Sequence, residues 1–182
     1  MAPEAWRRSQ SDTPDVERRL MVTWNEFTAA APDFAAAGLE RFMRSEIILL
    51  GSIRKDGSPR ISPVEADVVD GELMAGMMWQ SKKALDLLRD PRCIVHSTVH
   101  DRMDAMGEFK LRCHAADIKD PHKRDCYGEV LYARIKWRPE GDFHLFAFDI
   151  ESAAHVHYGD QKKHVTIWTP DGGITSRTED AP

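Results

Sequence analysis

Three consecutive residues, Ser81, Lys82 and Lys83, have the chemistry of an anion-binding site. Apolar residues with helical spacing follow them, so Ser81 takes the position of a helix N-cap and both lysines fall in the first turn. A helix N-terminus presents free N–H groups and the positive end of the helix dipole. Cations in the first turn oppose that dipole unless an anion binds there. This segment therefore predicts a site for a phosphate group.

Arg60 joins this group through an expected β-hairpin. Asp70-Gly71 is typical of a two-residue turn, because both residues tolerate the positive φ that such a turn requires. In that register Gly76 lies opposite Glu65, and Arg60 lies opposite Ser81; a bulge would shift the pairing by one residue. The same residues also fit two solvated lysines on an amphipathic helix beside an ordinary hairpin, and spacing leaves both interpretations open.

The expected hairpin also offers a surface for a flat ring. Ser62-Pro63 interrupts the first strand, and because proline donates no ladder hydrogen bond, one strand edge stays open. Gly76 has no side chain, which allows a flat ligand to approach the backbone. We expect an aromatic ring along Arg60–Val64 and Gly76–Met78, with its phosphate at residues 81–83. A kinked hairpin with a core glycine is the alternative.

Periodicity and turn signals predict the elements that must position these residues. Helices are expected after Pro32 with Asp33 as N-cap, from Ser81 to Asp90-Pro91, and from Asp120-Pro121. Six to eight strands are expected at residues 46–53, 59–69, 72–79, 92–99, 107–118, 143–158 and 164–168. Sequential hairpins make this sheet antiparallel. Residues 143–150 are apolar on both faces, which favours a barrel covered by helices or by a second subunit.

Length, charge and cysteine usage exclude several classes of protein. The 182 residues and the net charge of −5 fit one globular domain and argue against nucleic acid as a partner. No apolar run approaches the ~18 residues of a membrane span, and no apolar core of a secretory signal is present. Three cysteines without a C-x-x-C motif fit a reducing cytoplasm. We expect a mobile arm at residues 1–20, the domain at 21–170, and a polar, mobile tail at 171–182.

These segments resemble the pyridoxamine-5′-phosphate-oxidase-like, FMN-binding split β-barrel proteins. The resemblance spans residues 32–168 and rests on Gly57-Ser-Pro-Arg-Ile-Ser-Pro-Val64, Asp70-Gly71 and Ser81-Lys-Lys-Ala-Leu-Asp-Leu-Leu-Arg-Asp-Pro-Arg92. It implies a mainly β fold with flanking helices, a six-stranded antiparallel split barrel, and a homodimer with FMN at its interface. The cofactor-binding residues that it implies are Arg60, Ile61, Ser62, Pro63, Val64, Gly76, Met77, Ser81, Lys82 and Lys83. Among these, the phosphate ligands are Arg60, Ser81, Lys82 and Lys83.

The resemblance implies a flavin-dependent oxidoreductase for a small organic substrate, in which the flavin ring carries the hydride. The chain departs from true pyridoxamine phosphate oxidases, because Ile167-Trp168-Thr-Pro170 and Gly172-Gly173 stand where those proteins have an Arg-Leu-His-type motif. Vitamin B6 oxidation is therefore not expected, and no catalytic acid or base is assigned. One alternative is a deazaflavin (coenzyme F-420)-dependent reductase, whose acidic tail would need a basic surface; candidates are Arg89, Arg92 and Lys162-Lys163.

A further alternative is a non-enzymatic flavin- or haem-binding protein. His155-x-His157 has strand spacing, so both rings point to one face. A further ligand to a metal or to haem iron would come from His144, His164 or His114. Such a pair is also an ordinary polar surface feature, and we expect no metal site.

Overall fold

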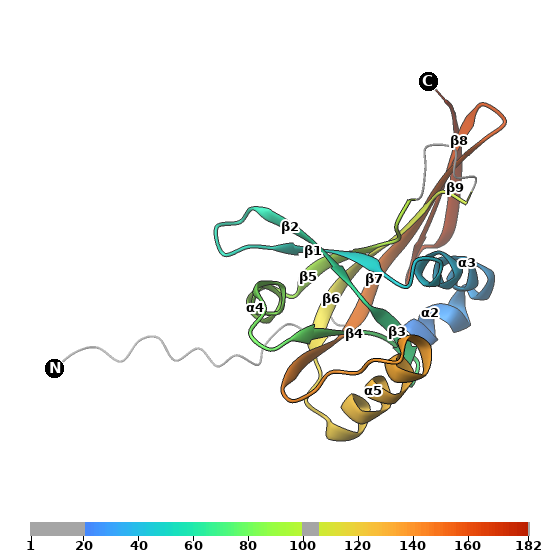
Figure 1. Cartoon of the computed structure of the whole chain (residues 1–182). Coiled ribbons are helices and arrows are strands. Elements are labelled where there is room, and N and C mark those ends of the chain that lie inside the picture. Colours follow the sequence, from blue (N-terminus) through green and yellow to red (C-terminus); the bar gives the residue numbers. More distant parts are fainter. Residues whose placement is uncertain (1–20, 100–105, 182) are drawn as a thin grey trace.

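A continuous antiparallel sheet forms the centre of the structure, a computed structural model that describes residues 21–99 and 106–181 (Figure 1). The strands are β1 (Ile48–Ile53), β2 (Pro59–Val64), β3 (Ala66–Val69), β4 (Glu72–Met78), β5 (Arg92–His96), β6 (Glu108–Asp117), β7 (Phe143–Gly159), β8 (Lys162–Thr169) and β9 (Gly173–Asp180). The helices are α2 (Trp24–Ala30), α3 (Pro32–Met43), α4 (Lys82–Arg89) and α5 (Pro121–Ile135). The arm expected at residues 1–20 lies outside the described residues.

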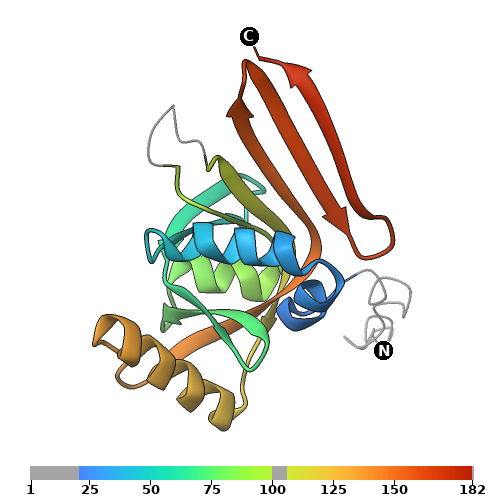
Figure 2. The same cartoon turned by 90° about the vertical axis from the view of Figure 1, so that its right-hand side faces the viewer.

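The strand order is β2-β1-β5-β6-β7-β4-β3, and β8 and β9 extend the sheet beyond β7. The sheet is not closed, although its end strands β2 and β3 follow each other in the chain through Glu65. The first half of β7 pairs with β4 and the second half with β8, so this strand connects the main body to a three-stranded arm (Figure 2). With nine strands in the described part, the six-strand count is not confirmed, whereas the mainly β, antiparallel architecture is.

The apolar segment at the start of β7 is buried on both faces, as predicted. Phe146 and Phe148 belong to the larger core cluster, which helices α2, α3 and α4 help to cover. Leu145 and Ala147 point the other way, into a smaller cluster that includes Tyr127 of α5. Helix α5 therefore covers the second face of the sheet and lies beside β3 and β4.

Local capping chemistry explains where the helices begin. Helix α5 begins after Asp120, whose carboxylate accepts hydrogen bonds from two backbone N–H groups of the first turn, as predicted. Helix α3 begins two residues earlier than expected. Its N-cap is Ala31, and Asp33 lies within the first turn because Pro32 already has the fixed φ of a helical residue. No helix within the described ranges is both long and apolar enough to cross a bilayer.

The C-terminal segment differs from the expected mobile tail. Residues 173–180 form β9, which pairs with β8 along its whole length after a turn at residues 170–172. All eight residues of β9 are exposed. The strand therefore lacks the alternation of apolar and polar residues that identifies a half-buried strand, and its polar composition concealed it.

Candidate functional site

The expected hairpin after β3 forms only in part. Asp70 and Gly71 have φ of 50° and 78°, and β3 and β4 pair in the predicted register as far as Ala66 opposite Ala75. At Glu65 the chain leaves this ladder, and β2 pairs with β1 instead. The turn at residues 54–58 gives β2 this nearer partner, and Pro63 has no N–H with which to continue the β4 ladder.

Arg60 therefore lies opposite Ser52 of β1, and its predicted pairing with Ser81 is wrong. The predicted site residues are divided between two sides of the start of α4. Pro63, Gly76, Met77, Ser81 and Lys83 line a cavity of about 740 Å³ between β2, β4, α4 and α5, which we call the groove cavity.

Arg60 and Lys82 line a different cavity of about 630 Å³, which we call the basic cavity. Its other lining residues are Arg54, Lys55, Asp56, Leu85, Asp86 and Arg89. Of the remaining predicted residues, Ile61 is 72% exposed on the outer sheet face, Ser62 is partly buried, and Val64 belongs to the core. The structure thus brings half of the predicted set into the groove cavity.

The end of the groove cavity at α4 has one unsatisfied polar group and one partly buried cation. The Ser81 hydroxyl is buried without a hydrogen-bond partner in the described structure, and it makes no cap bond to α4. A buried hydroxyl without a partner costs about 1–3 kcal/mol, so a ligand oxygen there would be favourable. Lys83 Nζ donates to the Pro63 carbonyl at 3.0 Å. Burial lowers the pKa of Lys83, and the nearby Glu65 carboxylate opposes this shift.

Tyr127 fills the space beside Gly76 that was expected to admit a flat ligand. A Cβ at Gly76 would lie 2.8 Å from Tyr127 Cε1. The Gly76 N–H donates to the Tyr127 hydroxyl at 2.8 Å, and this hydroxyl donates to the Glu65 carbonyl at 3.3 Å. The missing side chain therefore accommodates the tyrosine. The sequence does not predict Tyr127 as a site residue, because nothing near Gly76 in the chain points to a tyrosine on a distant helix.

Aromatic side chains form much of the remaining wall of the groove cavity. Trp79 is 51% exposed and stacks on the buried His144 ring, with centroids 4.5 Å apart and planes at 10°. Burial lowers the pKa of His144, which favours the neutral ring that stacks on Trp79. Trp137 and Phe143 line the cavity as well. The carboxylates of Glu65, Glu140 and Asp142 also line this cavity, so its aromatic wall is combined with charged groups of both signs. Aromatic side chains together with a few placed polar groups are typical of a ligand site.

The basic cavity is organised around Asp86 of α4. Arg60 Nε donates to Asp86 Oδ2 at 2.6 Å, and Arg89 Nη1 donates to Oδ1 at 3.2 Å. Burial raises the pKa of Asp86, but the hydrogen bonds and charges of the two arginines outweigh it and lower this pKa below its usual value. The positive charge in this cavity is thus already partly neutralised.

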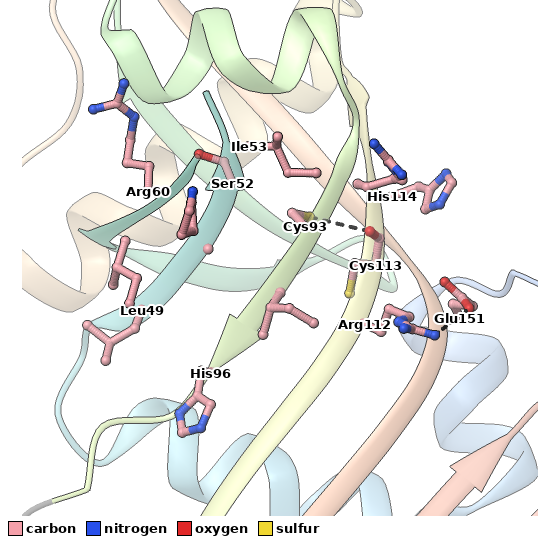
Figure 3. Close-up of a pocket in the computed structure, with 15 residues that line it drawn as sticks. Leu49, Ser52, Ile53, Arg60, Cys93, His96, Arg112, Cys113, His114 and Glu151 are labelled. Carbon is pink, nitrogen blue, oxygen red and sulfur yellow. Dashed lines mark hydrogen bonds and ion pairs between the residues drawn. The ribbon is translucent and has the colours of Figure 1, made fainter. Parts of the chain in front are cut away.

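A third cavity, of about 660 Å³, lies on the outer face of β2, β1, β5 and β6 (Figure 3), and we call it the sheet-face cavity. Arg60 lines this cavity as well as the basic cavity. Leu49, Ile53, Ile61 and Ile94 give it an apolar surface. Cys93 also lines it, but burial raises the pKa of this thiol to about 12, so it is not a thiolate at neutral pH. Exposed apolar side chains of this kind make the cavity a candidate surface for contact with another protein chain.

His155, His157 and His164 form a row of stacked rings on β7 and β8. Neighbouring centroids are 4.9 and 4.7 Å apart, with planes at 18° and 13°. The prediction that the H-x-H pair shares one face is confirmed. The rings lie parallel, and no group of three or more side chains in the described ranges is arranged to hold a metal ion. His144 and His114 lie elsewhere, against Trp79 and in the sheet-face cavity.

Solved structures with a similar fold include three proteins of different descriptions. PhzG from Burkholderia lata 383, solved with tetrahydrophenazine-1-carboxylic acid, has a TM-score of 0.56 and 10% identity over 86% of this chain and 93% of its own. A putative pyridoxamine 5′-phosphate oxidase from Listeria innocua gives 0.52 and 17% over 63% and 91%. HutZ, the haem storage protein of Vibrio cholerae, gives 0.50 and 15% over 67% and 90%.

These likenesses are to the fold: a mainly β, split-barrel architecture of the pyridoxamine 5′-phosphate oxidase-like type. No family model matches the chain. No curated protein matches it either. Since the similar structures include a putative oxidase and a haem storage protein, the activity has to be argued from the site.

Proposed function

We propose that this protein is an FMN-dependent oxidoreductase that binds the flavin in the groove cavity and acts on a small organic substrate. The observation that carries the proposal is the buried, unpartnered Ser81 hydroxyl at the N-terminus of α4, at one end of an aromatic-walled cavity. The cavity of about 740 Å³ falls within the ~300–1,000 Å³ typical of ligand sites. The fold and the resemblance in sequence both support this choice of cofactor.

The chain's own residues would bind and orient the cofactor. The Ser81 hydroxyl, the first-turn N–H groups of α4 and the Lys83 ammonium would hold the phosphate. Pro63 and Met77 would line the ring, with Gly76 beside the Tyr127 side chain that fills the adjoining space, and the tryptophans of the cavity wall would limit the access of water. When bound, FMN supplies the hydride-transfer chemistry, and the protein supplies orientation and exclusion of competing reactions. We assign no catalytic acid or base.

Arg60 and Lys82 would add to the phosphate site from the far side of the helix start. Arg60 is held by Asp86 through Nε, so its two terminal nitrogens stay available for a second anion contact. Lys82 is exposed and free to reorient. Both side chains would attract the phosphate over a longer distance than Ser81 and Lys83 do, and solvent would screen this attraction more strongly.

The homodimer is part of this proposal, and its surface is the sheet-face cavity. Ile61 is 72% and Ile94 is 38% exposed there. A second copy of the chain would cover this apolar face. Because Ile61 and Pro63 of β2 line the sheet-face cavity and the groove cavity respectively, the flavin would then lie near the interface, in a protein of the reducing cytoplasm. Replacing Ile61 by Asp should convert a dimer, measured by sedimentation, into a monomer. A wild type that sediments as a monomer at all concentrations would reject this part.

The decisive experiment is the visible absorption spectrum of the purified protein, repeated after FMN is added and excess is removed. A retained flavin spectrum near one equivalent per chain is the expected result. A protein that cannot hold FMN overturns the proposal. If it then acquires a Soret band with haem that the His157→Ala variant lacks, it is a haem-binding protein instead.

A deazaflavin-dependent reductase is the second candidate, and the basic cavity favours it. Five cationic side chains line this cavity against two carboxylates, and they lie beside the proposed phosphate site. Arg89, a candidate from the sequence, is among them, whereas Arg92 lines the sheet-face cavity. The acidic tail of coenzyme F-420 would fit such a surface. Tighter binding of F-420 than of FMN, lost at high salt, would favour this candidate; the reverse order excludes it.

A further inference from the structure

The Tyr127 hydroxyl occupies a place in the β3–β4 ladder. If the ladder continued beyond Ala66–Ala75, the next pair would be Glu65 and Gly76. In the structure the Gly76 N–H and the Glu65 carbonyl are instead joined through the Tyr127 hydroxyl, at 2.8 and 3.3 Å. One cross-strand hydrogen bond is thereby replaced by two bonds through a side chain from α5. The two strands separate at this point.

The position of this hydroxyl is fixed by contacts on both sides of it along α5. Arg124, one turn before, donates to the Phe143 carbonyl at 2.6 Å and lies 4.1 Å from the centre of the Phe143 ring. Arg134, two turns after, forms an ion pair with Asp67 of β3 at 2.8 Å. The Tyr127 side chain between them is fully buried. The helix is thus anchored to β7 and to β3, and the tyrosine is held between them.

The protonation state of the hydroxyl suits this double role. Burial raises the pKa of Tyr127 to about 12, against the opposing hydrogen bond from Gly76. The phenol therefore stays protonated at neutral pH and both accepts and donates. A phenylalanine would fill the same volume but would leave the Gly76 N–H and the Glu65 carbonyl free to bond to each other directly.

We propose that Tyr127 is a positioning residue for the ring of the cofactor, because it keeps β2 and β4 apart and so preserves the groove cavity between Pro63 and Met78. This inference rests on the proposed flavin function. It assigns Tyr127 to the ring end of the site, whereas Ser81 and Lys83 belong to the phosphate end. The two ends respond differently to flavins with and without a phosphate group.

The test is a fluorescence titration of the full-length protein with FMN and with riboflavin, which lacks the phosphate. Tyr127→Phe should weaken the binding of FMN and of riboflavin by the same factor, about tenfold for the loss of one buried hydrogen-bonding group. Lys83→Ala should weaken FMN alone. Tyr132→Phe is the matched control, since Tyr132 is on the same helix but 48% exposed, and neither affinity should change.

The outcomes separate this inference from the proposed function. A wild type that binds neither flavin overturns both. A wild type that binds FMN, with Tyr127→Phe unchanged toward both flavins, overturns the positioning role and leaves the function intact. A variant with a lower melting temperature but wild-type riboflavin affinity at a temperature where it is folded also overturns it, because that pattern reports a purely structural residue.

A second pair of variants tests the contact between Gly76 and Tyr127 from the glycine side. In Gly76→Ala the new Cβ would meet the tyrosine ring at 2.8 Å, so the ring must move and riboflavin affinity should fall. In a Tyr127→Ala background that clash is absent, and Gly76→Ala should then have little further effect. Equal effects in the two backgrounds would show that the residues are not coupled and would contradict the proposal.

Discussion

The groove cavity and the basic cavity lie on opposite sides of the start of α4, and they differ in how their polar groups are satisfied. The groove cavity has a buried hydroxyl, Ser81, without a partner and a lysine, Lys83, whose positive charge is disfavoured by burial. In the basic cavity Arg60 and Arg89 already bind the buried Asp86. Unsatisfied groups favour a ligand, whereas satisfied ones favour the folded chain. We therefore expect the groove side to contribute mainly to ligand binding and the basic side mainly to stability.

The largest effect should come from removing the carboxylate at the centre of the basic cavity. Asp86→Ala leaves two arginines without their shared partner, and we expect a loss of about 2–4 kcal/mol in the free energy of unfolding. Urea denaturation measures it. The control is Asp56→Ala in the same cavity, where the carboxylate is exposed and bonds only to the neighbouring Ser58. Equal losses in the two variants would contradict the assignment.

Two double variants compare the cavities directly as anion sites. The double variant Ser81→Ala/Lys83→Ala should bind FMN more weakly by about 2–3 kcal/mol, because a hydroxyl contact and a charge-assisted contact are both lost. Arg60→Ala with Lys82→Ala should cost less, since Asp86 already engages Arg60 and Lys82 is exposed. Isothermal titration with FMN gives both values. The reverse order would place the phosphate in the basic cavity and would favour the deazaflavin candidate.

The sequence predicted the parts of this site that depend on local chemistry. The turn at Asp70-Gly71 and the helix that begins after Ser81 are determined by residues within a few positions of each other, and both are as expected. The position of Arg60 was wrong because a strand chooses among partners, and β1 competes with β4 for β2. No pattern near Gly76 indicates that Tyr127, which is 51 residues away, fills the space beside it.

His144, beside the aromatic wall of the groove cavity, is a second residue whose neighbours could not be predicted from nearby sequence. Its position on β7 places it opposite Met77 and beneath Trp79, so it supports a cavity wall without lining the cavity. In the sequence it was one of several histidines considered only as ligands to a metal or to haem iron. Its actual neighbours follow from the pairing of β4 with β7, which joins segments about 70 residues apart. Contacts of that kind become visible only when the sheet order is known.

Acid titration should show whether the charge of Asp86 stabilises the basic cavity. Because the two arginines lower the pKa of Asp86 in the folded state, its ionised form stabilises the protein above the unfolded pKa of about 4. This contribution is lost as the pH falls through the lower, folded value. The difference in unfolding free energy between wild type and Asp86→Asn should therefore shrink as the pH falls below about 4. A constant difference would show that the carboxylate's charge is not what stabilises this cavity.

The smallest effect, and the one most specific to the groove side, concerns Lys83. Burial lowers the pKa of its ammonium group, so in the absence of a ligand the charged form is less stable in the folded protein than in the unfolded chain. The wild type should gain stability as the pH rises through this lowered value toward 10.5, and Lys83→Met should lack that gain.

At neutral pH Lys83→Met should unfold at a slightly higher temperature than the wild type while binding FMN more weakly, because the group that destabilises the empty cavity is the one that binds the phosphate. Lys82→Met is the matched control, since Lys82 is exposed at the same helix start, and its melting temperature should not rise. A Lys83→Met protein that melts earlier and binds FMN normally would reverse the roles of the two cavities. Differential scanning calorimetry between pH 7 and pH 10 provides these values, with and without FMN.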